Sequence, residues 1–380
     1  MNAFKVLWLV ILGYYFPLLL NSNDSVAHKN AHLKTVFLNK RILITGAGGS
    51  IGSEICRVVA LFSPSELILL DNNEYFLWKI RIELSEKFPH LNFTIFLADV
   101  SSFARIENIF QEKKPHIVFH AAALKHVKMV EENPCEGFLT NVIGTKNLSE
   151  AALRHDIEKF IFLSTDKAVN PSSRMGASKR IAELWLQSLQ ANSQQTVFNI
   201  LRFGNVYGSV GSVIPLFRHQ ISQGGPLTLT HESVSRYFIT HEKAVMGLLE
   251  VCFQSELRQQ TCTNMLYILE MGQPVKIMDL AKNLLMHSGQ KDNIEIKIVG
   301  LAKGEKIEEA LLYDDESQES ILGTDLLAVH SKRQIVNLES IKNHLEKIEQ
   351  ACRQSDAGEL LKITLKMLPE FSCSETYVGD

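Results

Sequence analysis

The stretch RILITGAGGSIG, from Arg41 to Gly52, joins a short apolar strand pattern to a glycine-rich turn and the start of a helical pattern. Its glycines are spaced three residues apart, one residue longer than in the G-x-G-x-x-G fingerprint of dinucleotide sites. Glycine permits the tight turn and lets backbone amides approach a pyrophosphate, which sits at the positive end of the helix. We therefore expect this turn to bind the phosphates of a dinucleotide through Gly46, Gly49, Ser50, Ile51 and Gly52.

An acidic residue follows the next apolar stretch. Leu67–Leu70 is followed directly by Asp71, which lies 25 residues after Gly46. A carboxylate at the end of the second strand accepts hydrogen bonds from both hydroxyls of an adenosine ribose and repels an added 2′-phosphate. The next residues, Asn72 to Glu74, include no arginine to bind that phosphate. The pattern therefore favours NAD over NADP.

Two further strand ends add contacts to the same expected site. Asp99 and Val100 end the third apolar stretch, and the sequence HAAA that starts at residue 120 ends the fourth. We expect the aspartate to meet the adenine amino group. The small side chains of Ala121, Ala122 and Ala123 leave room for the cofactor backbone.

Apolar stretches alternate with helical patterns through the first half of the chain. The expected strands lie at Ile42–Ile44, Leu67–Leu70, Phe93–Leu97, Ile117–Phe119, Phe160–Leu163 and Phe198–Leu201. This alternation predicts a parallel sheet with helices on both faces, whose strands are apolar throughout because both faces are buried. We therefore predict an α/β fold, a doubly wound parallel Rossmann sheet, with a smaller carboxy-terminal lobe that holds a substrate at the carboxyl edge.

The expected organisation has four parts. Residues 1–39 form an apolar segment and a polar linker, and residues 40–205 form the NAD-binding domain. Residues 206–330 form the substrate lobe, with some chain returning to the sheet, and residues 331–380 form a helical extension. Several glycines between residues 208 and 225 mark the loop-rich start of the lobe.

The composition excludes several classes of protein. Hydrophobic residues make up 46% of the chain and charged residues 21%, an ordinary globular balance. The net charge of −3 gives no electrostatic reason to expect a nucleic-acid partner. The six cysteines include no C-x-x-C pair, which argues against a zinc ribbon or a disulfide-stapled secreted domain and for a reducing compartment. We expect no metal site.

The amino terminus carries an apolar run from Val6 to Leu20, fifteen residues without a charge. A helix that crosses a bilayer needs about 20 such residues, so the run is short for a span. Basic residues are more numerous after the run than before it, which places the rest of the chain on the cytoplasmic side. We expect a cytoplasmic protein, with residues 4–20 forming either an anchor at the inner membrane face or a buried or fraying helix.

Seven motifs between about residues 40 and 240 resemble the extended short-chain dehydrogenase/reductase superfamily. They are TGAGGSIGSE (Thr45–Glu54), FHAAALKHVKMVEENP (Phe119–Pro134), TNVIGTKN (Thr140–Asn147), STDKAVNP (Ser164–Pro171), MGASKR (Met175–Arg180), RFGNVYGSVGSVIPLF (Arg202–Phe217) and SRYFIT (Ser235–Thr240). Weaker matches, among them GLAKGEK (Gly300–Lys306), extend the resemblance to about residue 325. Within the superfamily the chain is most similar to the UDP-N-acetylglucosamine 4,6-dehydratases of polysaccharide biosynthesis.

Two departures from the wider superfamily sharpen this resemblance. The usual Y-x-x-x-K pattern is MGASK here, so Met175 replaces the tyrosine, and a thioether cannot exchange a proton. Glucose-type sugar dehydratases carry Asp-Glu after the fifth strand, whereas this chain has Thr165, Asp166 and Lys167. Both departures are typical of the UDP-N-acetylglucosamine enzymes.

The resemblance implies a reaction without net redox change. NAD takes a hydride from sugar carbon 4, water is lost from carbons 5 and 6, and the hydride returns to carbon 6. We assign Asp166 as the acid for the leaving 6-hydroxyl, Lys167 as the base at carbon 5 and Thr165 as a partner of the 4-oxygen. Lys179 should bind the nicotinamide ribose and add positive charge. Asp166, or a water relayed through Thr165, removes the 4-hydroxyl proton in place of the missing tyrosine.

The assignment of Lys167 contains a conflict of charge. A lysine acts as a base only when it is neutral, and the neighbouring Asp166 favours the charged form. Burial, Lys179 and the oxidised nicotinamide favour the neutral form. We expect the second group of effects to prevail.

The same resemblance implies contacts to a UDP-sugar. Lys125 and His126 should face the sugar or its phosphates, while Asn205, Ser212 and Val213 hold the diphosphate. Arg236 should bind phosphate through its planar guanidinium, and Glu305 should meet uridine. We also expect a homo-oligomer, although no motif bears on that state.

Three functions stay open at this point. The first is a dehydratase that retains the configuration at carbon 5, which the MGASKR motif favours. The second is a related enzyme that inverts carbon 5 or epimerises the sugar. The third is a non-catalytic NAD-binding scaffold, against which the presence of Thr165, Asp166, Lys167 and Lys179 argues.

Overall fold

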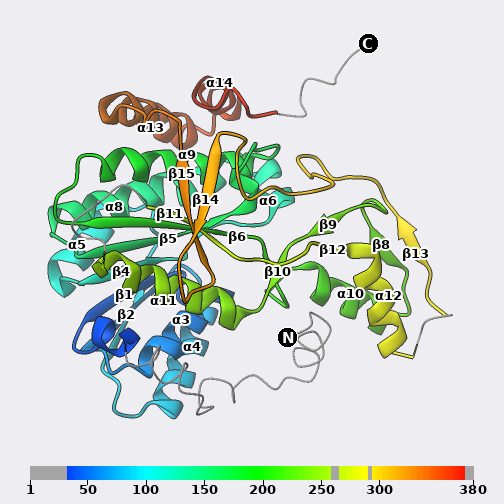
Figure 1. Cartoon of the computed structure of the whole chain (residues 1–380), viewed down its shortest axis with the longest axis horizontal. Coiled ribbons are helices and arrows are strands. Elements are labelled where there is room, and N and C mark those ends of the chain that lie inside the picture. Colours follow the sequence, from blue (N-terminus) through cyan, green and yellow to red (C-terminus); the bar gives the residue numbers. More distant parts are fainter. Residues whose placement is uncertain (1–31, 258–264, 290–292, 373–380) are drawn as a thin grey trace.

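A mostly parallel sheet forms the centre of the molecule (Figure 1). The computed structural model describes residues 32–257, 265–289 and 293–372. Within these residues, nine strands form one sheet in the order β14-β15-β11-β6-β5-β4-β1-β2-β3. The strands are β1 (Arg41–Thr45), β2 (Glu66–Asp71), β3 (Phe93–Leu97), β4 (Ile117–His120), β5 (Lys159–Thr165), β6 (Val197–Phe203), β11 (Leu266–Leu269), β14 (Glu316–Ser320) and β15 (Leu326–Ser331).

All neighbours from β3 to β11 pair in parallel, and β15 and β14 pair antiparallel at one edge. The chain therefore returns to the sheet after its excursion into the lobe. Because β1 and β4 are neighbours while β2 and β3 lie on the other side of β1, the strand order reverses between β1 and β4. The carboxyl ends of strands at such a reversal form the ligand crevice of doubly wound folds.

Side chains of each central strand alternate between two hydrophobic cores. In β1, Leu43 belongs to one core, while Ile42 and Ile44 belong to the other. The first core is covered by α5 (Phe103–Lys113), α8 (Gly144–Arg154), α9 (Arg174–Gln190), α13 (Leu338–Arg353) and α14 (Ala357–Met367). The second is covered by α3 (Ser50–Ala60), α4 (Glu74–Lys87) and α11 (His241–Leu257). Helices on both faces confirm the predicted doubly wound α/β class.

A smaller group of elements lies beyond the carboxyl ends of β5 and β6, at the right of Figure 1. It contains α10 (Val213–Ser222) and α12 (Ile277–His287), and it has a hydrophobic core of its own. Three short strand pairs accompany these helices: β7 (Asn205–Val206) with β10 (Phe238–Ile239), β9 (Ser235–Arg236) with β12 (Val275–Lys276), and β8 (Leu227–Leu229) with β13 (Ile296–Ile298).

The segment before β1 differs from the expected polar linker. Residues 32–37 are helical, and Leu33, Val36 and Phe37 are buried in the core beneath α3 and α11. Their spacing of three and four residues puts them on one face of a helix, so this part of the chain belongs to the domain rather than to a linker. The apolar run expected at residues 4–20 lies outside the described residues.

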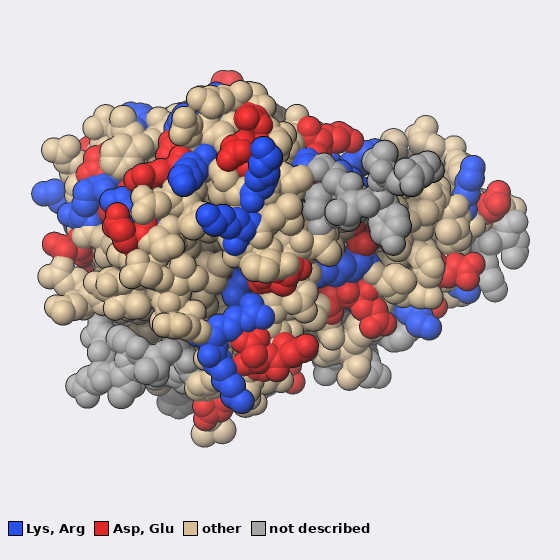
Figure 2. Space-filling view, turned by 90° about the horizontal axis from the view of Figure 1, so that it is seen from above, with Lys and Arg blue, Asp and Glu red and all other residues tan. Residues whose placement is uncertain are grey.

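Charged side chains of both signs are mixed on the surface. On the face shown in Figure 2, basic and acidic residues lie next to one another. This mixture agrees with a net charge of −3 over 380 residues.

Candidate functional site

The glycine turn after β1 fits its surroundings without space for a side chain. Gly46 has a φ of +64°, and a Cβ there would lie 2.7 Å from the backbone nitrogen of Ala122. A Cβ on Gly52 would overlap the carbonyl oxygen of Gly46. The turn leads into α3, whose N-cap, Gly49, offers no side-chain hydrogen bond to the first amides. These amides are therefore available to an anion at the start of the helix.

Asp71 ties the end of β2 to this turn. Its Oδ2 accepts a hydrogen bond of 2.8 Å from the amide of Gly48, and its Oδ1 accepts one of 2.9 Å from the amide of Asn73. A carboxylate has about four acceptor positions, so two remain for other donors. The predicted phosphate turn and ribose-binding acid thus lie side by side.

Asp99 and Val100 lie at the end of the neighbouring strand β3. The Asp99 carboxylate accepts hydrogen bonds from the amide of Ser101 at 2.8 Å and from Asn72 Nδ2 at 3.2 Å. Burial alone would raise the pKa of Asp99, but these hydrogen bonds outweigh it and lower the pKa. Val100 is buried against Gly144. The bond from Asn72 joins the ends of β2 and β3 at one edge.

The residues after β4 lie opposite the glycine turn. Ala121, Ala122 and Ala123 are half-buried, and Lys125 and His126 are exposed. A loop from the smaller lobe comes close to this segment, because a Cβ on Gly211 would overlap the His126 ring. Another residue of that loop, Val210, donates its amide to Ser50 Oγ at 3.1 Å. The two halves of the chain therefore meet over the start of α3.

Thr165, Asp166 and Lys167, the strand-end trio, follow β5 and are bonded to one another. Thr165 Oγ1 donates to Asp166 Oδ1 at 2.9 Å, and Lys167 Nζ donates to the same oxygen at 2.9 Å. The other oxygen, Oδ2, is buried without a hydrogen-bond partner. Lys167 Nζ also donates to Asn205 Oδ1 at 3.3 Å, which brings one predicted substrate residue to the trio. The trio thus combines a proton donor, an incompletely satisfied carboxyl and an amine.

The charge on Lys167 differs from the expected neutral form. Burial alone would lower the pKa of its amine, but the charges of Asp166 and Glu309 outweigh burial and raise the pKa. Glu309 Oε1 lies 3.7 Å from Lys167 Nζ. The expectation of an uncharged amine is therefore wrong for the structure as described, because a second carboxylate is close by.

Lys179 lies on α9, which packs against the trio through Gly176: a Cβ there would overlap the carbonyl oxygen of Lys167. The amine of Lys179 sits over the Phe162 ring, 3.9 Å from its centroid, and the residue is 6% exposed. Burial lowers its pKa to about 7, against the opposing charge of Glu183. Met175, one helical turn earlier, is buried in the position of the missing tyrosine. Lys179 thus loses its proton more readily than Lys167, whose pKa is raised.

The other predicted substrate residues form two groups. Ser212 is the N-cap of α10 and Val213 its first residue, and Ser212 Oγ is buried without a partner. Arg236 and Glu305 bind each other, with Nη2 3.3 Å from Oε1. Arg236 also donates to the carbonyls of Lys306 at 2.7 Å and Ile307 at 3.0 Å. Any phosphate or uridine contact of this pair would compete with these bonds, and it stays a prediction.

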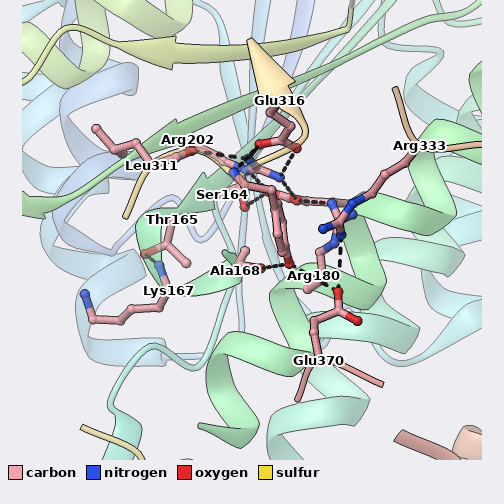
Figure 3. Close-up of polar contacts among 12 residues, drawn as sticks. Ser164, Thr165, Lys167, Ala168, Arg180, Arg202, Leu311, Glu316, Arg333 and Glu370 are labelled. Atoms are coloured by element: carbon pink, nitrogen blue, oxygen red, sulfur yellow. Dashed lines mark hydrogen bonds and ion pairs between the residues drawn. The ribbon is translucent and has the colours of Figure 1, made fainter. Parts of the chain in front are cut away.

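A second group of buried charges, the arginine cluster of Glu183, Arg202 and Glu316, is joined to the residue before the trio, Ser164. Figure 3 shows Arg202 and Glu316 close to Ser164. Arg202 donates to both oxygens of Glu183, at 2.8 and 2.7 Å, and to Glu316 Oε2 at 2.7 Å. Ser164, the residue before the trio, donates to Glu183 at 2.6 Å. In Figure 3 the side chain of Lys167 extends away from this cluster.

Tyr313 connects the arginine cluster with the trio. Its amide donates to Glu316 Oε2 at 3.0 Å, and its hydroxyl donates to the carbonyl of Ala168 at 2.8 Å. The guanidiniums of Arg333 and Arg180 lie 3.8 and 4.8 Å from its ring centroid. Tyr313 therefore fastens the loop that carries the trio to the arginine cluster.

Metal sites and membrane spans are two further features that the described part of the chain lacks. Among the described residues, no group of three or more histidine, cysteine or acidic side chains could hold a metal ion. Within residues 32–257, 265–289 and 293–372, no helix is both long and apolar enough to cross a bilayer.

Comparison with known proteins gives the family. Residues 42–331 match the family model described as polysaccharide biosynthesis protein. The chain belongs to this family. It is 46% identical over 295 residues to the capsular polysaccharide biosynthesis protein CapD of Staphylococcus aureus, covering 77% of this chain and 48% of CapD. The chain therefore spans about half the length of that relative.

Two other relatives are matched over a larger share of their own length. A UDP-N-acetylglucosamine 4,6-dehydratase (inverting) of Campylobacter jejuni is 31% identical, with 80% of this chain and 87% of that protein covered. A UDP-glucose 4-epimerase of Rickettsia rickettsii is 33% identical, with 74% and 80% covered. These two relatives confirm the resemblance that the sequence motifs predict.

Solved structures show the same fold. Pen from Bacillus thuringiensis has a TM-score of 0.71 and 29% identity, and the match covers 81% of this chain and 97% of Pen. The dTDP-glucose 4,6-dehydratase DesIV of Streptomyces venezuelae, solved with NAD and TYD bound, has a TM-score of 0.60 and 21% identity, with 71% of this chain and 88% of DesIV covered. At that identity the likeness supports the fold alone.

Sequence reasoning missed Glu309 and Lys306, although both lie in the stretch that matches the family model. The GLAKGEK motif ends at Lys306, and only Glu305 within it was expected to contact the substrate. Glu309 follows in an unremarkable acidic pair, Glu308 and Glu309. The sequence positions of Glu308 and Glu309 alone could not show that Glu308 is exposed and that Glu309 is buried at the trio.

Proposed function

We propose that this chain is a nucleotide-sugar 4,6-dehydratase that acts on UDP-N-acetylglucosamine in the synthesis of a surface polysaccharide or protein glycan. The observation that carries the proposal is the strand-end trio, in which Asp166 and Lys167 are bonded at 2.9 Å at the carboxyl end of β5. The family membership and the named activity of the Campylobacter relative support the choice of substrate.

The residues at the reversal of strand order fit NAD. The glycine turn leaves backbone amides open at the start of α3, and Asp71 keeps two acceptor positions for ribose hydroxyls. NAD would supply the acceptor that takes a hydride from sugar carbon 4 and gives it back to carbon 6. The residues that would hold it are Gly46, Gly49, Ser50, Ile51, Gly52, Asp71, Asp99, Val100, Ala121, Ala122, Ala123 and Lys179.

The members of the trio divide the proton transfers of the proposed reaction. The Thr165 hydroxyl donates to the sugar 4-oxygen after giving up its bond to Asp166. The proton of the 4-hydroxyl passes to Asp166, directly or through a water at Thr165, as the hydride leaves carbon 4. Asp166 then gives a proton to the leaving 6-hydroxyl, a role that suits a buried carboxyl with one oxygen left without a partner. Lys167 accepts the proton from carbon 5, for which its amine must first lose its own proton. Lys179, when protonated, adds positive charge near the 4-oxygen.

A 4-epimerase is the second candidate, and the Rickettsia relative of that name favours it. Epimerisation at carbon 4 needs proton transfer only at the 4-oxygen. The trio offers two additional titratable groups, Asp166 and Lys167, which a dehydration at carbons 5 and 6 requires. This surplus favours the dehydratase, and it also opposes a scaffold without turnover.

Proton NMR of the purified chain with UDP-N-acetylglucosamine and NAD in deuterated water tests the proposal. A dehydratase gives a new 6-methyl signal, deuterium at carbon 5 and a 4-keto product, and the ring couplings report whether carbon 5 is retained or inverted. Signals of the galacto isomer without a methyl signal would support the epimerase instead. An unchanged spectrum with NAD bound would contradict both.

A variant at the proposed base sharpens that test. Lys167→Ala should still bind NAD and should lose deuterium exchange at carbon 5. Lys297→Ala, an exposed lysine on β13, is the matched control and should exchange normally. Normal exchange in the Lys167 variant would refute its role as the base.

A further inference from the structure

Glu309 is a buried carboxylate that lies between two lysines. Its side chain is 4% exposed, with Oε1 3.7 Å from Lys167 Nζ and Oε2 3.5 Å from Lys306 Nζ. Both distances are those of ion pairs rather than of hydrogen bonds, and Oε2 is buried without a hydrogen-bond partner. A buried carboxylate with ion pairs this long adds little to the free energy of unfolding, because the ion pairs do not offset the cost of removing the charge from water.

The segment that carries Glu309 is nevertheless firmly held beside the trio. Lys306 Nζ donates to the carbonyl of Val169 at 2.8 Å, and Ser172 Oγ donates to the carbonyl of Gly304 at 2.9 Å. Arg236 binds the carbonyls of Lys306 and Ile307 from the lobe. The segment is thus fastened both to the loop after the trio and to β9, so Glu309 has a defined place.

Five groups surround the Lys167 amine. Two are negative, Asp166 at 2.9 Å and Glu309 at 3.7 Å, and Asn205 is a neutral acceptor at 3.3 Å. Two are positive: Arg236, which opposes the charge on Lys167, and Lys306, which shares Glu309 with it. Asp166 and Arg236 have other partners within the chain, whereas Glu309 pairs only with the two lysines in the described structure. Glu309 is therefore the group whose charge acts chiefly on Lys167 and Lys306.

We propose that Glu309 is a positioning residue that holds the Lys167 amine at the trio and sets its charge state. The inference rests on the proposed function, since Lys167 is there the base at carbon 5. While Glu309 is ionised, Lys167 keeps its proton, and the amine becomes a base only toward alkaline pH. Removing the negative charge makes the neutral amine more abundant at a given pH.

Chemical labelling of the amine tests this charge relation without depending on turnover. The full-length chain is treated with a trace of acetic anhydride across pH 7–10, and mass spectrometry follows the peptide with Lys167. We expect Glu309→Gln to acetylate at least about tenfold faster at pH 8, which corresponds to a pKa lower by about one unit. Glu308→Gln removes the same charge from an exposed neighbour and should stay within about twofold of the unaltered chain. Equal rates in the two variants would overturn the proposal.

A second variant is expected to slow the acetylation of Lys167. It keeps the proposal testable if Glu309→Gln does not fold. Lys306→Met removes a positive charge near Lys167 and leaves Glu309 to Lys167 alone, so acetylation should slow. Faster or unchanged acetylation would count against the proposal. Carbon-5 exchange in Glu309→Gln should also move to lower pH relative to the unaltered chain. If the unaltered chain labels as expected but shows no exchange, the proposed function fails while the assignment of Glu309 stands.

Discussion

Two groups of buried charge lie on either side of one strand end, and they differ in how completely they are paired. Ser164 and Thr165 are adjacent on β5, so their side chains point to opposite faces of the sheet. Ser164 donates to the arginine cluster, and Thr165 donates to Asp166 of the trio. Each group contains a cation within 3 Å of a carboxylate, one carboxylate in the trio and two in the arginine cluster.

The arginine cluster is joined by short, two-pronged hydrogen bonds. Arg202 contacts both oxygens of Glu183 and both of Glu316, at distances from 2.7 to 3.3 Å. At the trio, by contrast, Asp166 Oδ2 and the Oε2 of the neighbouring Glu309 have no hydrogen bonds. A structural cluster needs a hydrogen-bond partner for each of its buried polar atoms. Buried polar atoms without such a partner instead indicate a place where a ligand supplies the missing hydrogen bond. The difference therefore separates the trio from Glu183, Arg202 and Glu316, although Arg180 Nε beside the cluster is also buried without a partner.

The largest effect on turnover should come from a change in the trio, where a carboxylate oxygen has no hydrogen-bond partner. We expect Asp166→Asn to lower dehydratase turnover by about 10²–10⁴-fold, because an amide cannot transfer the proton. The amide oxygen keeps the bonds from Thr165 and Lys167, so the free energy of unfolding should change by no more than about 1 kcal/mol. Turnover by NMR and urea denaturation measure the two quantities, with the exposed Asp325→Asn as control. A stability loss of several kcal/mol would place Asp166 with the structural cluster.

Arg202→Met should have the converse effect. Removing the guanidinium leaves Glu183 and Glu316 buried without their partner, and the free energy of unfolding should fall by about 3–5 kcal/mol. Urea denaturation checks this. Arg353→Met, which breaks an exposed ion pair with Glu349, should cost no more than about 0.5 kcal/mol. Equal losses in both variants would show that complete pairing is not what stabilises the cluster.

Acid should weaken the arginine cluster in a defined range. Burial alone would raise the pKa of Glu183, but Arg202 and then Arg180 outweigh it and lower the pKa to about 2 from an ordinary 4.5. A carboxyl with a lower pKa in the folded chain stabilises the fold above pH 4.5, and that contribution is lost as the pH falls toward 2. Urea midpoints at pH 6, 4 and 3 should therefore fall less steeply in Glu183→Gln than in the unaltered chain. Parallel slopes would exclude Glu183 as a source of the acid sensitivity.

The smallest effect concerns the link between the two groups. Tyr313→Phe removes the hydrogen bond to the carbonyl of Ala168 and keeps the ring between Arg333 and Arg180. We expect a loss of about 1 kcal/mol in unfolding free energy and less than a tenfold loss in turnover. Tyr75→Phe, on the exposed face of α4, should change neither. A turnover loss as large as that of Asp166→Asn would mean that this bond alone places the trio.

Local spacing explains which features the sequence could predict. The glycine turn and Asp71 follow adjacent parallel strands, with Thr45 paired to Leu70, so two short motifs suffice to place them together. The trio could be placed at a strand end for the same reason, and its chemistry came from the family resemblance.

Features that depend on distant segments were beyond the sequence. The charge on Lys167 depends on Glu309, which reaches the trio from a segment without regular structure. Arg236 and Glu305 were each expected to face a substrate, yet opposite charges brought together by folding bind each other first. The helix at residues 32–37 was not predicted, because its three apolar residues among polar ones are too few to show a helical repeat.

The antiparallel hairpin of β14 and β15 carries Glu316 back to Arg202, 114 residues earlier in the chain. During synthesis on the ribosome, Arg202 and Arg180 therefore emerge long before Glu316, the second carboxylate that binds Arg202. A nascent domain that lacks the hairpin would enclose two cations with only Glu183 to neutralise them, which a low-dielectric interior does not tolerate. We expect the interior around β6 to close only once translation has passed this hairpin, so that the last strands made determine when the whole domain becomes native.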